Sequence, residues 1–158
     1  MSGVETVAGV EISISAAAPA TFNAAGYAAV TGWGLIGEVT DGGSHGRTYA
    51  EVKHNPIGTR GAQKLKGSYD EGTKTLQLAV DTADPGQIII KQALNSDDDF
   101  SFKVEYQGGD IDYFQAKVLS YQVATAGVDS IRSATVQLSI TTAKDGTGIV
   151  EVPAPATP

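Results

Sequence analysis

Alternation of apolar and polar residues, repeated in four segments, is the feature that most restricts how this chain can fold. The segments are residues 10–15, 76–80, 100–106 and 134–140. Successive side chains of a β-strand point to opposite faces, so this pattern predicts strands with one buried face and one exposed face. We expect a further strand over residues 113–123, and part of another over residues 35–40.

Short turn signals separate these segments. They are Asp70-Glu71-Gly72, Gly108-Gly109-Asp110 and Gly127-Val128-Asp129. Connections this short favour hairpins over crossovers, and hairpins join antiparallel strands. The sequence therefore predicts an antiparallel sheet.

Residues 84–95 break the alternation and predict a helix. Asp84 is typical of an N-cap, Pro85 suits the first turn, Gln87 could complete a capping box, and Asn95 could end the helix. A helix of about three turns is marginal alone in water, so it should pack against the sheet. The predicted fold class is mainly β, an antiparallel β-sandwich or barrel with one flanking α-helix.

Three segments carry no clear pattern. Residues 16–30 are rich in alanine and predict a loop with weak structure, and residues 42–61 form a glycine-rich excursion. At the C-terminus, residues 149–152 could form a short strand before a mobile end rich in proline and alanine. The length of 158 residues fits one domain.

Composition excludes several classes of protein. The 18 acidic and 11 basic residues give a net charge of -7, which argues against a general nucleic-acid binder and against attachment to an anionic membrane. The chain has no cysteine, which excludes disulfides and thiolate metal sites. No lysine or arginine precedes Arg47, and no apolar run is long enough to cross a bilayer. We therefore expect a protein that is made and kept in a cytoplasm until it is used.

Residues that could carry chemistry are few. His45 and His54 lack metal-ligand spacing, and we expect both to be solvated loop residues. The run Asp97-Asp98-Asp99 lacks the order of an EF-hand loop and is expected to be a solvated turn. No nucleophile elbow, P-loop or dinucleotide motif occurs. The prediction is a protein that is not an enzyme, with no catalytic residue, no metal and no cofactor.

Trp33 is the single tryptophan of the chain. It could serve as a sugar-stacking platform, but a lone tryptophan is more often a core or interface anchor. The second interpretation is the preferred one.

Charge is distributed unevenly along the chain. The residues before Arg47 include four acids and no base, whereas residues 47–66 include five bases and the single acid Glu51. The residues after Lys66 include thirteen acids and six bases. Complementary patches on identical chains can pair head to tail and generate rings or filaments. Charge alone does not decide between such pairing and a solvated loop whose charge maintains solubility.

Several segments, taken in order, carry a family resemblance. They are Ile36-Gly37-Glu38-Val39-Thr40-Asp41-Gly42-Gly43, Lys64-Leu65-Lys66-Gly67-Ser68-Tyr69-Asp70, Thr75-Leu76-Gln77-Leu78-Ala79, Asp84-Pro85-Gly86-Gln87, Phe102-Lys103-Val104, Phe114-Gln115-Ala116-Lys117-Val118 and Ser133-Ala134-Thr135-Val136-Gln137-Leu138. Over residues 21–142 the sequence resembles the major tail tube proteins of long-tailed, lambda-like (siphovirus-type) bacteriophages. The order of strands and helix, and no single motif, supports the resemblance.

The resemblance implies a β-sandwich tail tube domain over residues 1–142, with an N-terminal arm at 1–8 and an assembly loop at 41–63. Residues 143–158 form a C-terminal extension, too short for the immunoglobulin-like domain of some members. Family members stack as hexameric rings whose inner sheets join around a channel, and a long loop reorganises on assembly and reaches the adjacent ring. Residues 42–61 match that loop, and their glycines are expected to keep it disordered in the monomer.

The implied function is that of a structural virion protein whose tube conducts viral DNA into the host. The implied partners are further copies of the chain, tail-tip initiator and terminator proteins, and the tape measure protein and viral DNA in the lumen, with no membrane. The implied location is the virion tail, assembled in the host bacterial cytoplasm.

Two sets of residues are predicted to serve this function. The contacts between subunits or rings are assigned to Arg47, Lys53, His54, Arg60, Lys64, Asp97, Asp98 and Asp99. Acidic residues are expected to line the lumen, because basic groups repeated along many rings would retain DNA, and Glu105 and Asp112 are the candidates. The alternatives are the tube of a contractile tail, a tailocin or a type VI secretion system, and a monomeric carbohydrate-binding β-sandwich that uses Trp33 and tyrosines.

Overall fold

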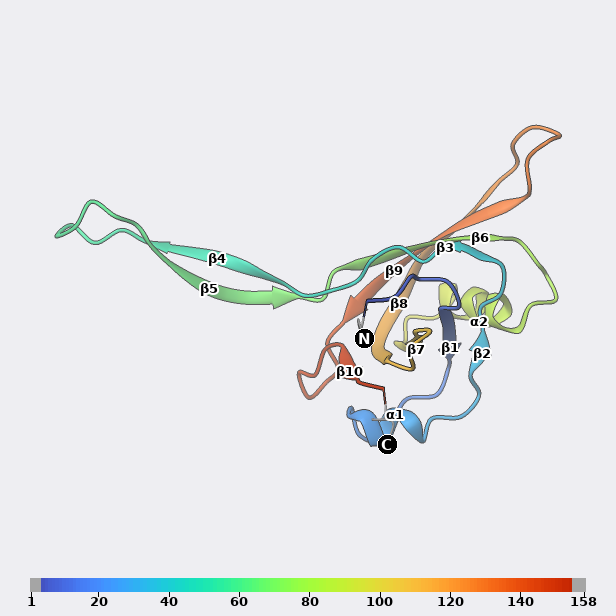
Figure 1. The fold of residues 1–158 in the computed structure, drawn as a ribbon, viewed down its shortest axis with the longest axis horizontal. Helices are drawn as coiled ribbons and strands as arrows, with labels where there is room; N and C mark the ends of the chain where they lie inside the picture. Colours follow the sequence, from blue (N-terminus) through green and yellow to red (C-terminus); the bar gives the residue numbers. More distant parts are fainter. Residues whose placement is uncertain (1–3, 155–158) are drawn as a thin grey trace.

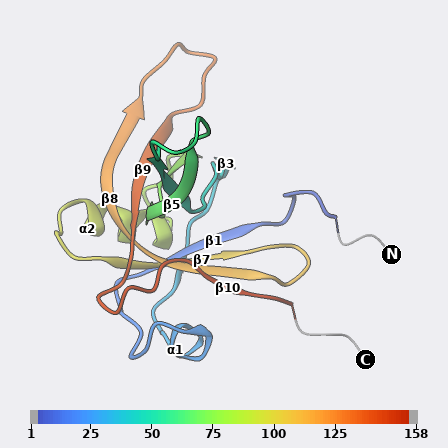
Figure 2. The same ribbon diagram turned by 90° about the vertical axis from the view of Figure 1, so that its left-hand side faces the viewer.

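The protein folds as a strongly curled antiparallel sheet that forms a half-barrel, from which a long two-stranded ribbon projects (Figures 1 and 2). The computed structural model describes residues 4–154. The elements in chain order are β1 Glu11–Ser15, α1 Ala24–Ala28, β2 Gly34–Leu35, β3 Val39–Asp41, β4 Thr48–His54, β5 Gln63–Asp70, β6 Thr73–Ala79, α2 Pro85–Leu94, β7 Phe100–Glu105, β8 Ile111–Ala124, β9 Ser133–Thr141 and β10 Val150–Val152.

The main sheet has eight strands, ordered β2-β1-β7-β8-β9-β6-β3, with β10 added beside β8. Its strand pairs are antiparallel. The predicted fold class, mainly β with an antiparallel sheet and one flanking helix, is confirmed. The tight turns at Gly108-Gly109-Asp110 and Gly127-Val128-Asp129 lie in the β7–β8 and β8–β9 hairpins, as predicted.

The four alternating segments form strands β1, β6, β7 and β9, and their apolar positions face the hollow of the curled sheet. Ile14, Leu76, Phe102 and Leu138 are fully buried there. The ring of Phe102 stacks on that of Phe114 from β8, with the centroids 5.4 Å apart. The period-two pattern thus identified the core side chains as well as the strands.

Helix α2 closes the hollow, and it begins and ends where the sequence predicts. The side chain of Asp84 accepts a hydrogen bond from Gln87 N, Pro85 lies in the first turn, and Asn95 is the C-cap. The capping box is not completed. The Gln87 side chain is buried and accepts from Asp81 N while donating to the carbonyl oxygens of Gly37 and Ala79. Gln87 therefore fixes the helix to the neighbouring strands.

The strand expected over residues 35–40 is split into β2 and β3. Asp84 Oδ2 accepts a hydrogen bond from Gly37 N at 3.0 Å, which turns the backbone away from the sheet. Glu38 then adopts a left-handed conformation, with φ of 59°. The break follows from the contact with the helix cap, 47 residues later in the chain.

The alanine-rich segment is more ordered than predicted, because it contains α1. Asn23 caps this helix by accepting from Gly26 N at 2.8 Å. Tyr27, which is 1% exposed, stacks on Tyr113 with ring centroids 5.0 Å apart. The segment therefore covers the part of the outer face around Tyr113, opposite the core.

The glycine-rich excursion is not a disordered loop. Residues 48–54 form β4, which pairs with the eight residues of β5, and neither strand was predicted from the alternating pattern. The predicted hairpin turn at Asp70-Glu71-Gly72 is also wrong. It joins β5 to β6, which pair with different partners, namely β4 and β9.

The short strand expected near the C-terminus is confirmed as β10, which pairs with residues 111–113 of β8. The C-terminal extension thus contributes one short strand to the main sheet. Residues 155–158 of the proline-rich end, and residues 1–3 of the expected N-terminal arm, lie outside the described residues. Over residues 4–154, neither length nor hydropathy would let a helix cross a membrane.

The contacts of Gln87 predict a specific loss of stability. Gln87→Met keeps the volume of the side chain but leaves Asp81 N and two carbonyl oxygens without their partner. Each such group costs about 1 to 3 kcal/mol, so we expect the free energy of unfolding in urea to fall by about 3 kcal/mol. Gln92→Met, at an exposed position of the same helix, is the control and should change it by less than about 0.5 kcal/mol. Equal effects of the two changes would contradict this account.

Candidate assembly site

We call β4, β5 and the connecting residues 55–62 the arm. Its register gives it two unlike faces. Tyr49 pairs with Tyr69, Glu51 with Lys66 and Lys53 with Lys64, so these side chains share a basic and aromatic face. The ammonium group of Lys66 lies 4.8 Å from the centroid of the Tyr49 ring, which agrees with this assignment.

The opposite face of the arm is apolar at its centre. Val52 pairs with Leu65 on this face, and the side chains are 47% and 60% exposed. No other element of the described chain covers them, since each strand of the arm pairs only with the other. An exposed two-stranded ribbon with one apolar face and unpaired edges is typical of a segment that contacts another chain.

Arg47 connects the base of the arm to the half-barrel. Its Nε donates to Oε1 of Glu71 at 2.7 Å, and its guanidinium lies 3.9 Å from the centroid of the Tyr69 ring. The Glu71 side chain is 1% exposed, and its second oxygen accepts from Ile149 N at 3.4 Å. A buried carboxylate needs such partners, so Arg47 has an internal role.

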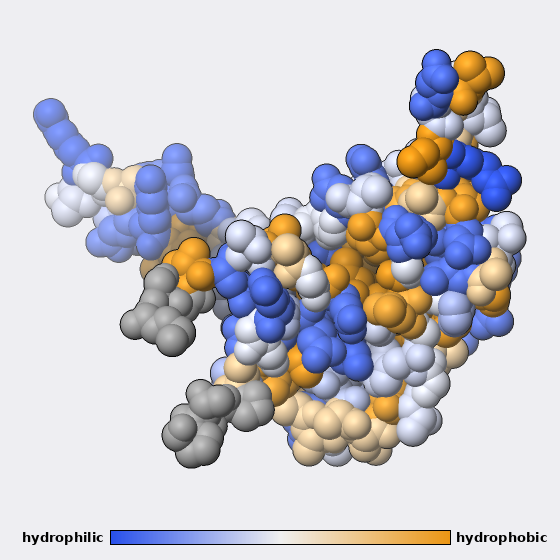
Figure 3. Space-filling view, turned by 45° about the vertical axis from the view of Figure 1, so that its right-hand side comes forward, coloured by the Kyte–Doolittle hydropathy of each residue, from blue (hydrophilic) through white to orange (hydrophobic). Residues whose placement is uncertain are grey.

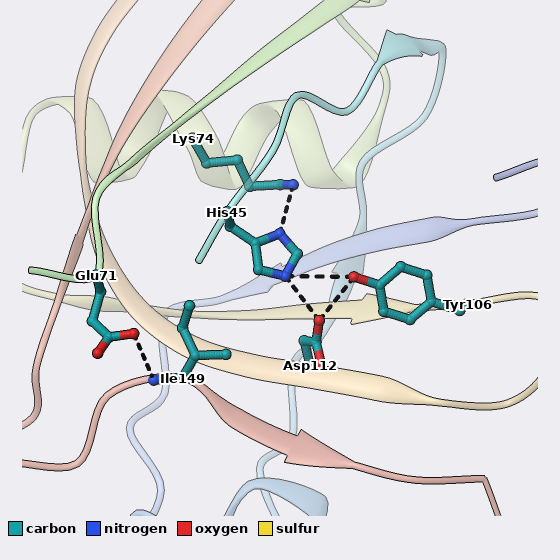
Figure 4. A network of polar contacts seen from close by, with 6 residues as sticks. All are labelled: His45, Glu71, Lys74, Tyr106, Asp112 and Ile149. Carbon is teal, nitrogen blue, oxygen red and sulfur yellow. Dashed lines mark hydrogen bonds and ion pairs between the residues drawn. The ribbon is translucent and has the colours of Figure 1, made fainter. Parts of the chain in front are cut away.

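His45 lies two residues before Arg47, in a polar cluster with Lys74 of β6, Asp112 of β8 and Tyr106, which directly follows β7 (Figure 4). Its Nε2 is 2.8 Å from Oδ2 of Asp112, and its Nδ1 is 3.0 Å from Nζ of Lys74. Tyr106 donates its hydroxyl to the same Asp112 oxygen at 2.8 Å. The expectation that His45 is a solvated loop residue is wrong, because its side chain is only 11% exposed.

The contacts suggest hydrogen-bond roles within the cluster. The Lys74 ammonium can only donate, so Nδ1 of His45 accepts from it and Nε2–H donates to Asp112. Burial lowers the pKa of Lys74 to about 8, although the charges of Asp112 and Asp41 oppose the shift. Burial alone would raise the pKa of Asp112, but hydrogen bonds from His45 and Tyr106 and the charge of Lys74 leave it below its usual value.

This cluster borders a pocket of about 880 Å³, which is otherwise lined mainly by aliphatic side chains and the linker of residues 40–47. Both nitrogens of His45 already have partners, so neither is free to act as a general base. Within residues 4–154, histidines and carboxylates do not gather in groups of three or more that could hold a metal ion. The arrangement is suited to fixing the base of the arm against the half-barrel.

The structure places the other predicted contact residues in two groups. Lys53, His54, Arg60 and Lys64 are exposed on the arm. Asp97, Asp98 and Asp99 lie after α2 in the turn that leads to β7, where Asp99 forms an ion pair with Lys117. The arm thus carries a cluster of bases, and the aspartates lie on the body.

The two lumen candidates lie on opposite faces of the sheet. Asp112 pairs with Val104, so its side chain shares the core face, whereas the next residue, Glu105, points the other way. Glu105 lies directly across from Glu11 of β1, on the outer face. Asp112 is bound within the chain, so the two carboxylates cannot line one wall together.

Trp33 is half-buried and belongs to the layer on the outer face. Its ring centroid is 6.3 Å from that of Tyr113, and Lys103 Nζ lies 5.0 Å from the Trp33 ring. These contacts agree with an anchoring role. Lys74 and Glu71 were not predicted as functional residues, although Lys74 occupies a buried-face position of β6 in line with Leu76 and Leu78, and Glu71 lies just before that strand.

The lowered pKa of Lys74 predicts a pH dependence of stability. Between about pH 8 and the ordinary lysine value of 10.5, the unfolded chain binds more protons than the folded chain, so stability rises with pH. We expect a slope approaching about 1.4 kcal/mol per pH unit from pH 8 to 9.5, below the range in which tyrosines titrate. Lys74→Met should flatten this slope, measured by urea unfolding, whereas Lys53→Met on the exposed arm should keep it. A slope that survives Lys74→Met would contradict the assignment.

No protein-family model matches the sequence, and no curated protein matches it. Solved structures do. A chain in the six-fold symmetrised baseplate of the anti-feeding prophage superposes with a TM-score of 0.65 and 13% identity, over 96% of this chain and 97% of that chain. The SPP1 tail tube protein superposes with a TM-score of 0.60 and 15% identity, over 90% of this chain and 75% of that chain. A chain of the sheath/tube terminator of the contractile injection system PVC, in its extended state, superposes with a TM-score of 0.63 and 11% identity, over 95% of this chain and 97% of that chain. At these identities the likeness concerns the fold, and the chain has the fold of phage tail tube proteins.

Proposed function

We propose that this protein is a structural, non-catalytic subunit that polymerises as stacked hexameric rings into a tail tube. The observation that supports this most directly is the arm, an ordered basic ribbon that projects from an acidic body and whose strands, within the described chain, pair only with each other. A soluble monomer gains nothing from exposing such a ribbon, whereas identical subunits can use it to reach one another.

The proposed tube belongs to a lambda-like, long-tailed phage and conducts viral DNA into the host. Its proposed partners are further copies of the chain, tail-tip initiator and terminator proteins, and the tape measure protein and DNA in the lumen. The proposed location is the virion tail, with assembly in the host cytoplasm. The sequence resemblance over residues 21–142 supports this version, as does the likeness to the SPP1 tail tube.

A contractile machine is the second candidate. The likeness to chains from the anti-feeding prophage baseplate and the PVC terminator, each covered over 97% of its length, favours it. Binding of a sheath protein to the assembled tube would support this candidate. The carbohydrate-binding alternative loses its main residue, because Trp33 packs against Tyr113 and Lys103.

The proposed lumen surface is acidic, and the outer face supplies one pair of carboxylates for it. Glu11 and Glu105 lie directly opposite each other on β1 and β7. Like charges at such positions destabilise a sheet, so a functional requirement for negative charge would explain why they are there. We assign Glu105 to the proposed lumen and withdraw Asp112 from it.

The proposed contacts between subunits are the basic side chains of the arm, with the acidic turn Asp97-Asp98-Asp99 as a further contact surface. Arg47 is the exception in the predicted set, because Arg47→Glu would place a second carboxylate against buried Glu71 and disturb the monomer. The bases nearer the end of the arm, such as Arg60 and Lys64, allow a cleaner test.

Charge reversal on the arm should prevent polymerisation without unfolding the subunit. The purified protein is concentrated and examined by negative-stain electron microscopy and sedimentation, and we expect hollow rods or stacked rings. Lys64→Glu should lower the sedimented fraction at least tenfold, since one reversed charge is repeated at every contact. Lys144→Glu makes the same change at an exposed position of the body and should have less than a twofold effect.

Circular dichroism and thermal unfolding of the monomer serve as the folding control for both variants. Normal rods from Lys64→Glu would rule out the arm charges as assembly contacts. Failure of the unmodified protein to form any ordered polymer, even when seeded with tail tips, would count against the proposed function.

A further inference from the structure

A second protrusion leaves the half-barrel at the end away from the arm. Strand β8 continues past the last residue paired with β7, and with β9 it forms a hairpin that projects from the body (Figures 1 and 3). We call residues 123–132 of this hairpin the hairpin tip. A register shift between Val118 and Ser120 accompanies the departure of β8 from the main sheet.

The hairpin tip exposes large apolar side chains, as Figure 3 shows. Val128 is 102% exposed, Ile131 77% and Val123 44%. Two of these residues occupy a connecting segment, where polar side chains would be the ordinary choice. Neither protrusion covers the other within one chain, because they leave opposite ends of the molecule (Figure 1).

The arm differs in charge from the hairpin tip and from the rest of the chain. The tip carries the acid Asp129 and the base Arg132, which balance each other, and the residues outside 47–66 carry 17 acids and six bases. Residues 47–66 of the arm carry five bases and one acid. The arm and the tip therefore match in their exposed apolar residues, and the acidic remainder of a second copy is opposite in charge to the basic face of the arm.

We propose that the apolar face of the arm, centred on Val52 and Leu65, packs on the hairpin tip of a second copy of this chain. The inference rests on the proposed self-assembly and names the acceptor of the arm. Two different surfaces at opposite ends make a heterologous contact, so each copy can donate its arm to one neighbour and accept an arm from another. Such contacts repeat into a ring or an open filament. The basic face of the arm then lies outward, where it can meet acidic side chains of the same neighbour.

Cysteine crosslinking tests the contact directly, because the natural chain contains no cysteine. The double variant Val52→Cys/Ile131→Cys is assembled under the conditions in which the unmodified chain forms rods, and is treated with a short bismaleimide. We expect a ladder of covalent multimers under denaturing conditions. Glu51→Cys/Ile131→Cys places the arm cysteine on the opposite face, at a position outside the proposed basic contacts, and should give at least fivefold less multimer.

A polar substitution provides a second, independent readout. Ile131→Asp should lower the sedimented fraction at least tenfold, whereas Thr135→Asp, at an exposed position of β9, should change it less than twofold. Neither site contributes to the buried core, so both monomers should unfold as the unmodified chain does.

The outcomes separate this inference from the proposed function. Rods formed normally by Ile131→Asp, or equal crosslinking from both faces of the arm, would overturn the inference while leaving tube formation intact. Absence of rods from the unmodified chain would overturn the proposed function, and this inference with it.

Discussion

The pairing of strand β8 with its neighbours is the interaction on which the rest of the structure depends. Its 14 residues pair with β7, β9 and β10 in turn, and α2 packs against it. Phe114 contributes to the core, Asp112 binds His45 at the base of the arm, and the last residues form one side of the hairpin tip. One strand therefore connects the core with both protrusions.

The base of the arm is fixed by buried polar contacts and not by apolar packing. Lys74 and Glu71 are each 2% exposed, and burial of a charged group costs free energy unless it is paired and hydrogen-bonded. Here the pairs are specific in geometry, since His45 has one donor and one acceptor partner and Arg47 meets Glu71 through Nε. Such contacts specify a direction for the arm, which nonspecific apolar contacts would not do.

A defined direction matters if the arm must reach a neighbouring copy. An arm that is ordered beforehand loses less conformational entropy on docking than a disordered loop does. Its exposed edges and apolar face are a risk in the free monomer, and the bases along the other face reduce that risk through mutual repulsion between arms. The acidic body of a neighbouring copy then attracts the arm, whereas two arms repel each other.

The sequence by itself determined the core strands, the position of α2 and the separation of charge. Period-two alternation and the Asp84-Pro85 cap each involve only a few neighbouring residues, so they can be recognised from short stretches of sequence. It did not reveal that residues 48–54 are a strand, because the pairing partner, β5, was not recognised and glycines flank the segment. It also gave no sign that Glu105 and Asp112 lie on opposite faces.

Only the tertiary structure brought His45, Lys74 and Asp112 together, from positions up to 67 residues apart. In the sequence each of these is an ordinary polar residue. Burial and the shared contact with His45 give Lys74 and Asp112 their role in fixing the base of the arm. The same holds for the two apolar protrusions, since the sequence contains their residues but not their placement at opposite ends. Local pattern decided which segments are strands, and long-range pairing decided what those strands place side by side.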